Sequence, residues 1–165
     1  MKITGKVWKF GDDINTDLIF PHTAFRVSEE EQVKLIFSDN RPGWAEQVEK
    51  GDIIVAGKNF GTGSSRPGAL LLRRLGLGGM LSDSMNGLFF RNCVGYGFSA
   101  LQAEGVSDIF EEGDIAEFDL HSGLIKNLTT NKEIQGIPVS ESMIETINAG
   151  GIEELLTTQG FMDAK

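Results

Sequence analysis

The segment from Gly61 to Arg66 places three kinds of anion-binding group close together in the chain. It reads Gly-Thr-Gly-Ser-Ser-Arg. Residues 52–57 before it are typical of a short buried strand, and residues 69–75 after it are typical of a helix. A glycine turn that leads from a strand into a helix collects backbone N–H groups, hydroxyls and a guanidinium, and the first turn of a helix attracts anions. We therefore expect an anion site here.

The glycine pattern argues against a nucleotide-binding loop. The segment lacks a terminal Gly-Lys-Ser/Thr, and it is not a G-x-G-x-x-G sequence. Gly63 followed by Ser64, Ser65 and Arg66 suits a smaller anion, such as a carboxylate, because arginine binds carboxylates through paired hydrogen bonds. The same residues also fit a plain strand-to-helix turn with a capping serine, and composition alone leaves both interpretations open.

A second polar group comes earlier, at residues 15–17, which read Asn-Thr-Asp. Asp17, together with Arg26 in the loop expected at residues 22–27, is predicted to face the glycine segment from the end of a strand-like element. The alternative is an Asx turn with a solvated surface arginine, and the residues themselves do not exclude it.

Other chemically capable residues are expected to be structural. Arg91 lies on an apolar helix and is interpreted as an ion-pairing or helix-terminal residue. Cys93 on the same helix is interpreted as a small core residue. His22 and His121 have no sequence neighbours that would complete a metal pair, so both are assigned to the surface or to loops.

Composition excludes several classes of function. A chain of 165 residues with 40% hydrophobic residues is expected to form one domain, spanning 1–165, with a substantial core. A net charge of −9 argues against nucleic-acid binding. One cysteine excludes an internal disulfide and a chain-encoded iron–sulfur or zinc-thiolate site, and it fits a reducing, cytoplasmic location. No signal-peptide pattern is recognised in the sequence and no apolar run approaches the ~18 residues of a membrane span, so we expect neither export nor membrane spanning.

The helices and strands that would position these residues are predicted from hydrophobic periodicity and from residues that begin or end helices and strands. A first strand is predicted at residues 3–9, and a helix capped by Ser28 with Glu31 is predicted to end near Ser38. The central region is predicted to alternate strand, helix, strand, helix and strand with parallel pairing, at 52–57, 69–75, 78–82, 85–95 and 98–101. Pro67 is assigned to the first helical position of the 69–75 helix, and Ser84 is assigned as the cap of the 85–95 helix.

The pattern changes after Gly113. Strands are predicted at 115–120, 124–128 and 132–137, which together form a β meander appended to the α/β unit. A helix over 140–148 is expected to end at Gly150-Gly151, with a further helical turn or two through Leu156. The tail 157–165 is expected to be frayed.

Taken together, these motifs resemble a known family. The resemblance rests on four segments, which are residues 5–17, residues 51–61, the Gly-Ser-Ser-Arg block at 63–66 and the Phe-Phe-Arg-Asn stretch at 89–92. The chain resembles the small subunit of 3-isopropylmalate dehydratase, which is the independent form of the swivelling domain of aconitase-like hydro-lyases. The resemblance implies an α/β swivel-type domain with a central parallel or mixed sheet, flanking helices and an appended β meander.

The same resemblance implies roles for particular residues. In this family a large partner subunit carries a [4Fe–4S] cluster, and the small subunit caps the cleft in a heterodimer or heterotetramer. By resemblance, Ser64 is the base that takes a proton from carbon, Arg66 and Ser65 hold the substrate carboxylate, and Asp17 and Arg26 also face the site. A set of nearby residues is thus expected to bind substrate. That set comprises Ser65, Arg66, Arg26, Asp17, Gly63 and Thr62. The chain itself is expected to hold no metal and to be inactive alone.

Departures from the family pattern leave the substrate open. The usual Glu-His-Ala after Ser-Ser-Arg is replaced by residues 67–69, Pro-Gly-Ala, and basic residues usual before the second helix are absent from residues 83–87. The default substrate is 3-isopropylmalate. The alternatives are homoaconitate, citramalate or a dimethylmalate-type acid, and a non-catalytic carboxylate-binding module of the same fold.

Overall fold

A single mixed sheet organises the molecule. The structure is a computed structural model that describes residues 1–64 and 66–165. Seven strands in these residues form the sheet in the order β4-β3-β2-β1-β5-β6-β7. The strands are β1 (Lys2–Lys9), β2 (Ile53–Ala56), β3 (Gly79–Ser82), β4 (Ala100–Gln102), β5 (Ile115–Asp119), β6 (Leu124–Asn127) and β7 (Lys132–Gln135).

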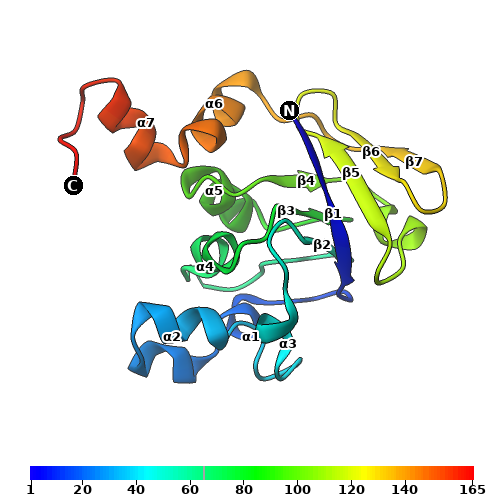
Figure 1. Ribbon diagram of the computed structural model, residues 1–165, viewed down its shortest axis with the longest axis horizontal. Coiled ribbons are helices and arrows are strands. Elements are labelled where there is room, and N and C mark those ends of the chain that lie inside the picture. The colour runs from blue at the N-terminus through cyan, green and yellow to red at the C-terminus, as the bar shows by residue number, and fades with distance from the viewer. Residues whose placement is uncertain (65) are drawn as a thin grey trace.

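In Figure 1 the helices lie to the left of the strands and below them. The α-helices in the described residues are α1 (Thr16–Ile19), α2 (Glu29–Lys34), α3 (Trp44–Gln47), α4 (Gly68–Leu75), α5 (Gly87–Gly95), α6 (Glu141–Ala149) and α7 (Ile152–Thr158). Two 3₁₀ helices, η1 (His22–Arg26) and η2 (Val106–Ile109), complete the set. None of the helices in the described parts of the chain is long and apolar enough to cross a membrane.

The strands β1 to β4 pair in parallel, as predicted for the central region. Val7 pairs with Ile53, Ile53 with Gly79, and Met80 with Ala100. Every residue of β2 and β3 is buried. The helices α4, between β2 and β3, and α5, between β3 and β4, cover one face of the sheet, and a second group of apolar side chains covers the other. This arrangement brings the carboxyl ends of the parallel strands, and the loops that follow them, to one edge.

The strands β5 to β7 form the predicted meander. β5 pairs antiparallel with β1, β6 with β5, and β7 with β6. Burial alternates along β6, where Ile125 and Asn127 are buried and their neighbours are only partly covered. The alternation is typical of an antiparallel strand that has one face on a core and the other toward water.

Two apolar cores lie on opposite faces of the sheet. The first packs α1 to α5 against the sheet around the buried rings of Phe10, Phe37 and Trp44, which meet in tilted and edge-to-face pairs. The second joins β5, β6, η2 and α6 around Phe110, Phe118 and other buried side chains. The two cores hold the sheet rigid, so the loops at its edge have a fixed base.

Several predicted boundaries were wrong by a few residues. The helix that begins after Ser28 ends at Lys34 and not near Ser38, and β4 begins at Ala100 and not at Phe98. Residues 22–27, expected to be a loop, contain η1. The helices α1, α3 and η2 were not predicted, because each is only four residues long and carries too few turns for a period to be seen.

Two predicted caps differ in the structure. Asn86, and not Ser84, caps α5, since its side-chain oxygen accepts the Leu88 N–H at 2.9 Å. Ser84 instead accepts the Asn59 N–H at 2.9 Å, which ties it to the glycine loop. Pro67 stands at the cap of α4 and not at its first helical position.

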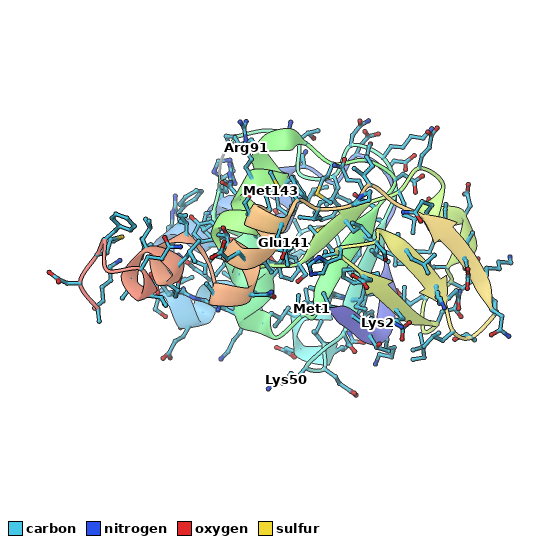
Figure 2. All side chains as sticks on the ribbon, turned by 90° about the horizontal axis from the view of Figure 1, so that it is seen from above. Met1, Lys2, Lys50, Arg91, Glu141 and Met143 are labelled. Atoms are coloured by element: carbon cyan, nitrogen blue, oxygen red, sulfur yellow. The ribbon has the colours of Figure 1, made fainter. Side chains whose placement is uncertain are left out.

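The C-terminal region follows the predicted order. α6 ends at Gly150, whose left-handed backbone allows its N–H to cap the helix, and α7 follows at once. The first two residues of the tail that was expected to fray, Thr157 and Thr158, belong to α7. Glu141 and Met143 of α6 are labelled in Figure 2, which is seen from above.

We predict that Gly5→Ala weakens the contact between β1 and the turn before β2. A Cβ at residue 5 would overlap the carbonyl oxygen of Gly51, so the strands must move apart. The free energy of unfolding should fall by about 2–3 kcal/mol, measured by denaturant titration. Gly11→Ala is the matched control, since a Cβ there meets no described atom within 4 Å. Equal unfolding midpoints for the two variants would contradict this packing.

Candidate functional site

The glycine loop lies at the carboxyl edge of the parallel strands, between two other segments. On one side, Gly61 N donates to Ile14 O at 2.7 Å, and Thr16 N donates to Thr62 O at 2.8 Å. On the other side, Phe60 N donates to Ser84 O at 3.1 Å. The edge beyond the carboxyl ends of parallel strands is where ligands bind in open α/β sheets. The loop is therefore held from both sides at a position suited to ligand binding.

Glycine is required at residue 61 by packing as well as by backbone angle. Gly61 has a φ of 77°, and a Cβ there would overlap the side chain of Phe89 on α5. Gly63 has a φ of 109°, and a Cβ there would come within 2.9 Å of Thr16 Oγ1. These two close approaches press the loop against α5 on one side and α1 on the other.

Arg66 is anchored by α1 and η1. Its Nη1 donates to Phe20 O at 2.6 Å, and its Nη2 lies 2.5 Å from Asp17 Oδ1. Nη2 also lies 3.4 Å from His22 Nε2, and the guanidinium stands 5.3 Å from the centre of the Phe25 ring. Only 9% of the Arg66 side chain is exposed, so these contacts fix its orientation.

Asp17 reaches Arg66 because α1 begins where it does. Asn15 caps α1 by accepting the Leu18 N–H at 3.0 Å, which places Asp17 in the first turn, where a carboxylate is favoured by the unpaired N–H groups of the helix. The Asp17 side chain is 57% exposed, whereas Arg66 is nearly covered. The pair is thus a fixed cation with a counter-ion that remains accessible to solvent.

Ser64 is exposed and opens onto a small depression. The depression is too shallow to enclose a water molecule, and it is lined by Thr16, Gly61, Gly63, Ser64, Arg66, Leu88, Phe89 and Asn92. The hydroxyl of Ser64 is therefore not buried among aliphatic neighbours. Ser65, also predicted to bind substrate, lies outside the described residues.

The beginning of α4 does not match the alternative interpretation of a strand-to-helix turn with a capping serine. The helix starts at Gly68, and its cap residue Pro67 makes no side-chain capping bond. Ser64 thus stands four positions before the first helical residue, in the turn itself. The polar groups nearest to Ser64 in the chain are therefore those of the turn and of Arg66, and the first residue of the helix lies farther along the chain.

The remaining candidate residues, Arg26, Arg91 and His121, are exposed. Arg26 is exposed at the end of η1 and makes no ion pair with any described residue. Arg91 is exposed at the edge of the molecule (Figure 2), and the ion pair predicted for it is not found among the described residues. His121 contacts Glu141 at 3.2 Å on the far side of the sheet, which agrees with its assignment to the surface.

Sequence reasoning missed three residues around Arg66 and the glycine loop. His22 and Phe25 contact the guanidinium, and Thr16 carries a buried hydroxyl beneath Gly63. A one-turn 3₁₀ helix has no periodic signal, so nothing in the sequence placed His22 and Phe25 on the same side. Their spacing of three residues, which aligns side chains in a 3₁₀ helix, is the one available hint.

A larger hollow lies elsewhere, between α7 and the C-terminal residues. Its empty volume is about 850 Å³, and Glu153, Glu154 and Asp163 contribute to its lining. These carboxylates would repel an anionic ligand. No group of three or more His, Cys, Asp or Glu side chains in residues 1–64 and 66–165 is arranged to hold a metal ion.

Comparison with known proteins identifies the family. Residues 13–106 match the model of the aconitase C-terminal domain. The chain is 38% identical over 160 residues to 3-isopropylmalate dehydratase small subunit 1 of Methanopyrus kandleri, covering 96% of this chain and 94% of the relative. It is 40% identical over 161 residues to the protein of that name from Thermotoga maritima, covering 96% of each. This chain belongs to the family of 3-isopropylmalate dehydratase small subunits.

The fold agrees with that family. The crystal structure of a 3-isopropylmalate dehydratase (LeuD) from Methanocaldococcus jannaschii superposes with a TM-score of 0.88 at 31% identity, covering 97% of this chain and 96% of the other. A relative from the same organism, 39% identical over 152 residues (91% of this chain and 90% of the relative), is named isopropylmalate/citramalate isomerase small subunit. The resemblance inferred from the Gly-Ser-Ser-Arg block and the predicted swivel-type α/β fold are both confirmed.

The buried cysteine of this small subunit should be chemically silent. Burial raises the pKa of the Cys93 thiol, and the side chain has no exposed surface. We expect native protein treated with iodoacetamide at neutral pH to remain unmodified by mass spectrometry, and unfolded protein to gain one carbamidomethyl group. Rapid alkylation of the native protein would contradict the packing of α5.

Proposed function

We propose that this chain is the small subunit of a heteromeric hydro-lyase that isomerises 3-isopropylmalate by dehydration and rehydration, a step of leucine biosynthesis. The observation that carries the proposal is an anchored, nearly covered Arg66 beside an exposed Ser64, in a chain whose relatives bear the name of that enzyme. Residues 1–165 would act as one swivelling domain that covers the substrate cleft of its partner.

Ser64 is proposed as the base that removes a proton from the substrate carbon. A serine hydroxyl is a weak base, so it can serve only where its deprotonated form is stabilised by nearby donors and positive charge. The turn before α4 and the guanidinium two residues away provide such a setting. Because Ser64 is exposed in this subunit, a substrate held by the partner would have direct access to it.

Arg66 is proposed to bind a substrate carboxylate, with Ser65, Thr62 and Gly63 beside it. Its present counter-ion, Asp17, is more than half exposed, so a substrate carboxylate can approach the same face of the guanidinium. The contact with Phe20 O uses Nη1 and would persist when substrate binds, which keeps the planar group aligned. Arg26 would contribute charge from the exposed end of η1.

The partner in this proposal is a large subunit that carries a [4Fe–4S] cluster. The relatives are named small subunits, which implies a complex, and this chain has a single, buried cysteine. When bound in the large subunit, the cluster supplies a Lewis acid for departure of the substrate hydroxyl. The small subunit supplies the base and the carboxylate site. The complex is proposed to work in the cytoplasm.

Citramalate is the second candidate substrate. One relative carries both isopropylmalate and citramalate in its name, so this pair of acids occurs within the family. Homoaconitate is the unsaturated form of a malate-type tricarboxylic acid, and dimethylmalate-type acids carry methyl groups on the malate frame. Each can be tested with the same reconstituted complex by following absorbance of the unsaturated product.

We predict that Ser64→Ala abolishes turnover in a complex reconstituted with a cluster-bearing large subunit. Loss of the proposed base should reduce kcat by at least about 100-fold, within the range expected for a general base, while co-purification of the two subunits is unchanged. Ser142→Ala, an exposed position on α6, serves as the control.

Normal activity of Ser64→Ala would refute the assigned base. Failure of the unaltered chain to support turnover of any malate-type acid, despite binding a dicarboxylate, would instead favour the non-catalytic module. The two failures differ because only the second affects the unaltered chain.

We also predict that Arg66→Lys raises KM for the substrate by about 10- to 100-fold. Lysine presents a point charge that cannot bind Phe20 O and a carboxylate with the same planar geometry. Arg74→Lys, at an exposed pair with Glu29 on the surface, is the matched control and should leave KM unchanged. Steady-state kinetics of both variants provide the comparison, and an equal KM for the two would count against Arg66.

A further inference from the structure

Thr16 carries a buried hydroxyl that has no hydrogen-bond partner among the described residues. Only 6% of the residue is exposed, yet it contributes to the lining of the depression onto which Ser64 opens. Trp44 Nε1 and Ser82 Oγ are the other buried side-chain atoms without a partner in the described parts of the chain, and neither residue lines this depression.

The backbone holds the Thr16 hydroxyl where it is. Thr16 N donates to Thr62 O at 2.8 Å, and Thr16 O accepts from Phe20 N at 2.9 Å. On its outer side stands Gly63, where a Cβ would lie 2.9 Å from Thr16 Oγ1. The hydroxyl is thus held against the turn that carries Ser64, although it makes no hydrogen bond to Ser64 in this structure.

A buried hydroxyl without a partner is costly, typically by about 1–3 kcal/mol relative to a bonded one. A threonine at the first position of a helix has no carbonyl of an earlier helical turn to which its hydroxyl could donate. A methyl group in place of the hydroxyl would avoid the cost. Packing alone therefore does not explain a hydroxyl at this position. A hydrogen bond that forms only during the reaction would explain it.

We propose that Thr16 donates a hydrogen bond to the Ser64 oxygen when that oxygen is deprotonated, and so positions and stabilises the base. This inference rests on the proposed function. The proton from the substrate carbon goes to Ser64, and Thr16 keeps its own proton throughout. Hydrogen bonds to an ionised acceptor are about twice as strong as neutral ones, so one donor at this place has a large effect.

The charged groups near Ser64 do not replace the hydrogen bond that Thr16 would donate. Arg66 lines the same depression, but its guanidinium is already engaged by Phe20, Asp17 and His22. Its positive charge is therefore partly offset by the Asp17 carboxylate. A neutral hydroxyl with an unused proton adds stabilisation that does not compete with these contacts.

The first test replaces Ser64 with cysteine and uses the thiol as a reporter. The natural cysteine, Cys93, is fully buried, so the reaction of iodoacetamide with the native protein reports residue 64 alone. The rate is measured against pH for Ser64→Cys by itself and combined with Thr16→Val or Thr16→Ser. Arg66, Asp17 and His22 are common to all three proteins, so differences isolate the Thr16 hydroxyl.

We expect Thr16→Val to slow alkylation at pH 7 by about 3- to 10-fold and to move the inflection of the profile to higher pH, because a thiolate loses its donor. Thr16→Ser should restore the profile, since it keeps the hydroxyl. Superimposable profiles for threonine and valine would overturn the inference. Circular dichroism checks that all variants are folded.

The second test uses the reconstituted complex with Ser64 in place. Thr16→Val should lower kcat by about 10- to 100-fold with KM changed by less than twofold, and Thr16→Ser should recover at least a third of the rate. The melting temperature of the Thr16→Val protein should equal or exceed that of the unaltered chain, because a buried hydroxyl without a partner is replaced by a methyl group. An unchanged kcat would refute the role of Thr16.

The two tests separate the inference from the proposed function. If the unaltered complex fails to turn over any malate-type acid, the proposed function fails, and the thiol profiles still decide whether Thr16 serves residue 64. If the complex is active but either the thiol profile or kcat is unchanged by Thr16→Val, the inference fails alone.

Discussion

The contact between the Arg66 guanidinium and the carbonyl oxygen of Phe20 is the interaction on which the site depends. It joins two segments that are 46 residues apart, at a distance of 2.6 Å, and it is part-buried. With Asp17 as counter-ion and Phe25 against its face, the guanidinium has one available orientation. Without this anchor, a long flexible side chain would lose its direction, and a carboxylate site requires direction as much as charge.

The anchor works only because the sheet brings its parts together. The glycine loop leaves the carboxyl end of β2, and its backbone bonds to the segment after β1 and to the segment after β3. Gly61 and Gly63 allow the loop to lie against α5 and α1 at distances that any side chain would prevent. The same close approach covers the hydroxyl of Thr16 and leaves Ser64 outward. Exposure of one hydroxyl and burial of the other are two results of a single packing arrangement.

The proposed division of catalytic roles between two polypeptides has a physical basis in this chain. Its lone thiol is buried in the core, and its net charge of −9 makes a local cation necessary wherever an anionic substrate binds. Arg66 is such a cation, already oriented. In the proposed function, this subunit presents a base and a carboxylate site to a cleft completed by another chain, and the relatives are named as small subunits.

Much of the architecture was predictable from local pattern. The buried run at residues 53–56, the glycine turn and the helix after it lie next to one another in the chain, so their order indicated the crossover and the anion site. The meander was predictable for the same reason. The ends of the helices were harder to predict. Asn86 and Ser84 are equally good helix caps by residue type. Asn86 caps α5 because the side chain of Ser84 instead accepts the Asn59 N–H of the glycine loop.

The sequence by itself determined the fold class, the family and the segment that carries Ser64 and Arg66, because these are properties of contiguous residues. Only the tertiary structure decided the partners of that segment. Asp17, His22, Phe25 and Thr16 lie more than 40 residues before Arg66 in the chain, and η1 and α1 are too short to show a period. Their side chains meet the glycine loop because β1 and β2 are neighbours in the sheet, and contacts made by strand pairing leave no local mark in the order of amino acids.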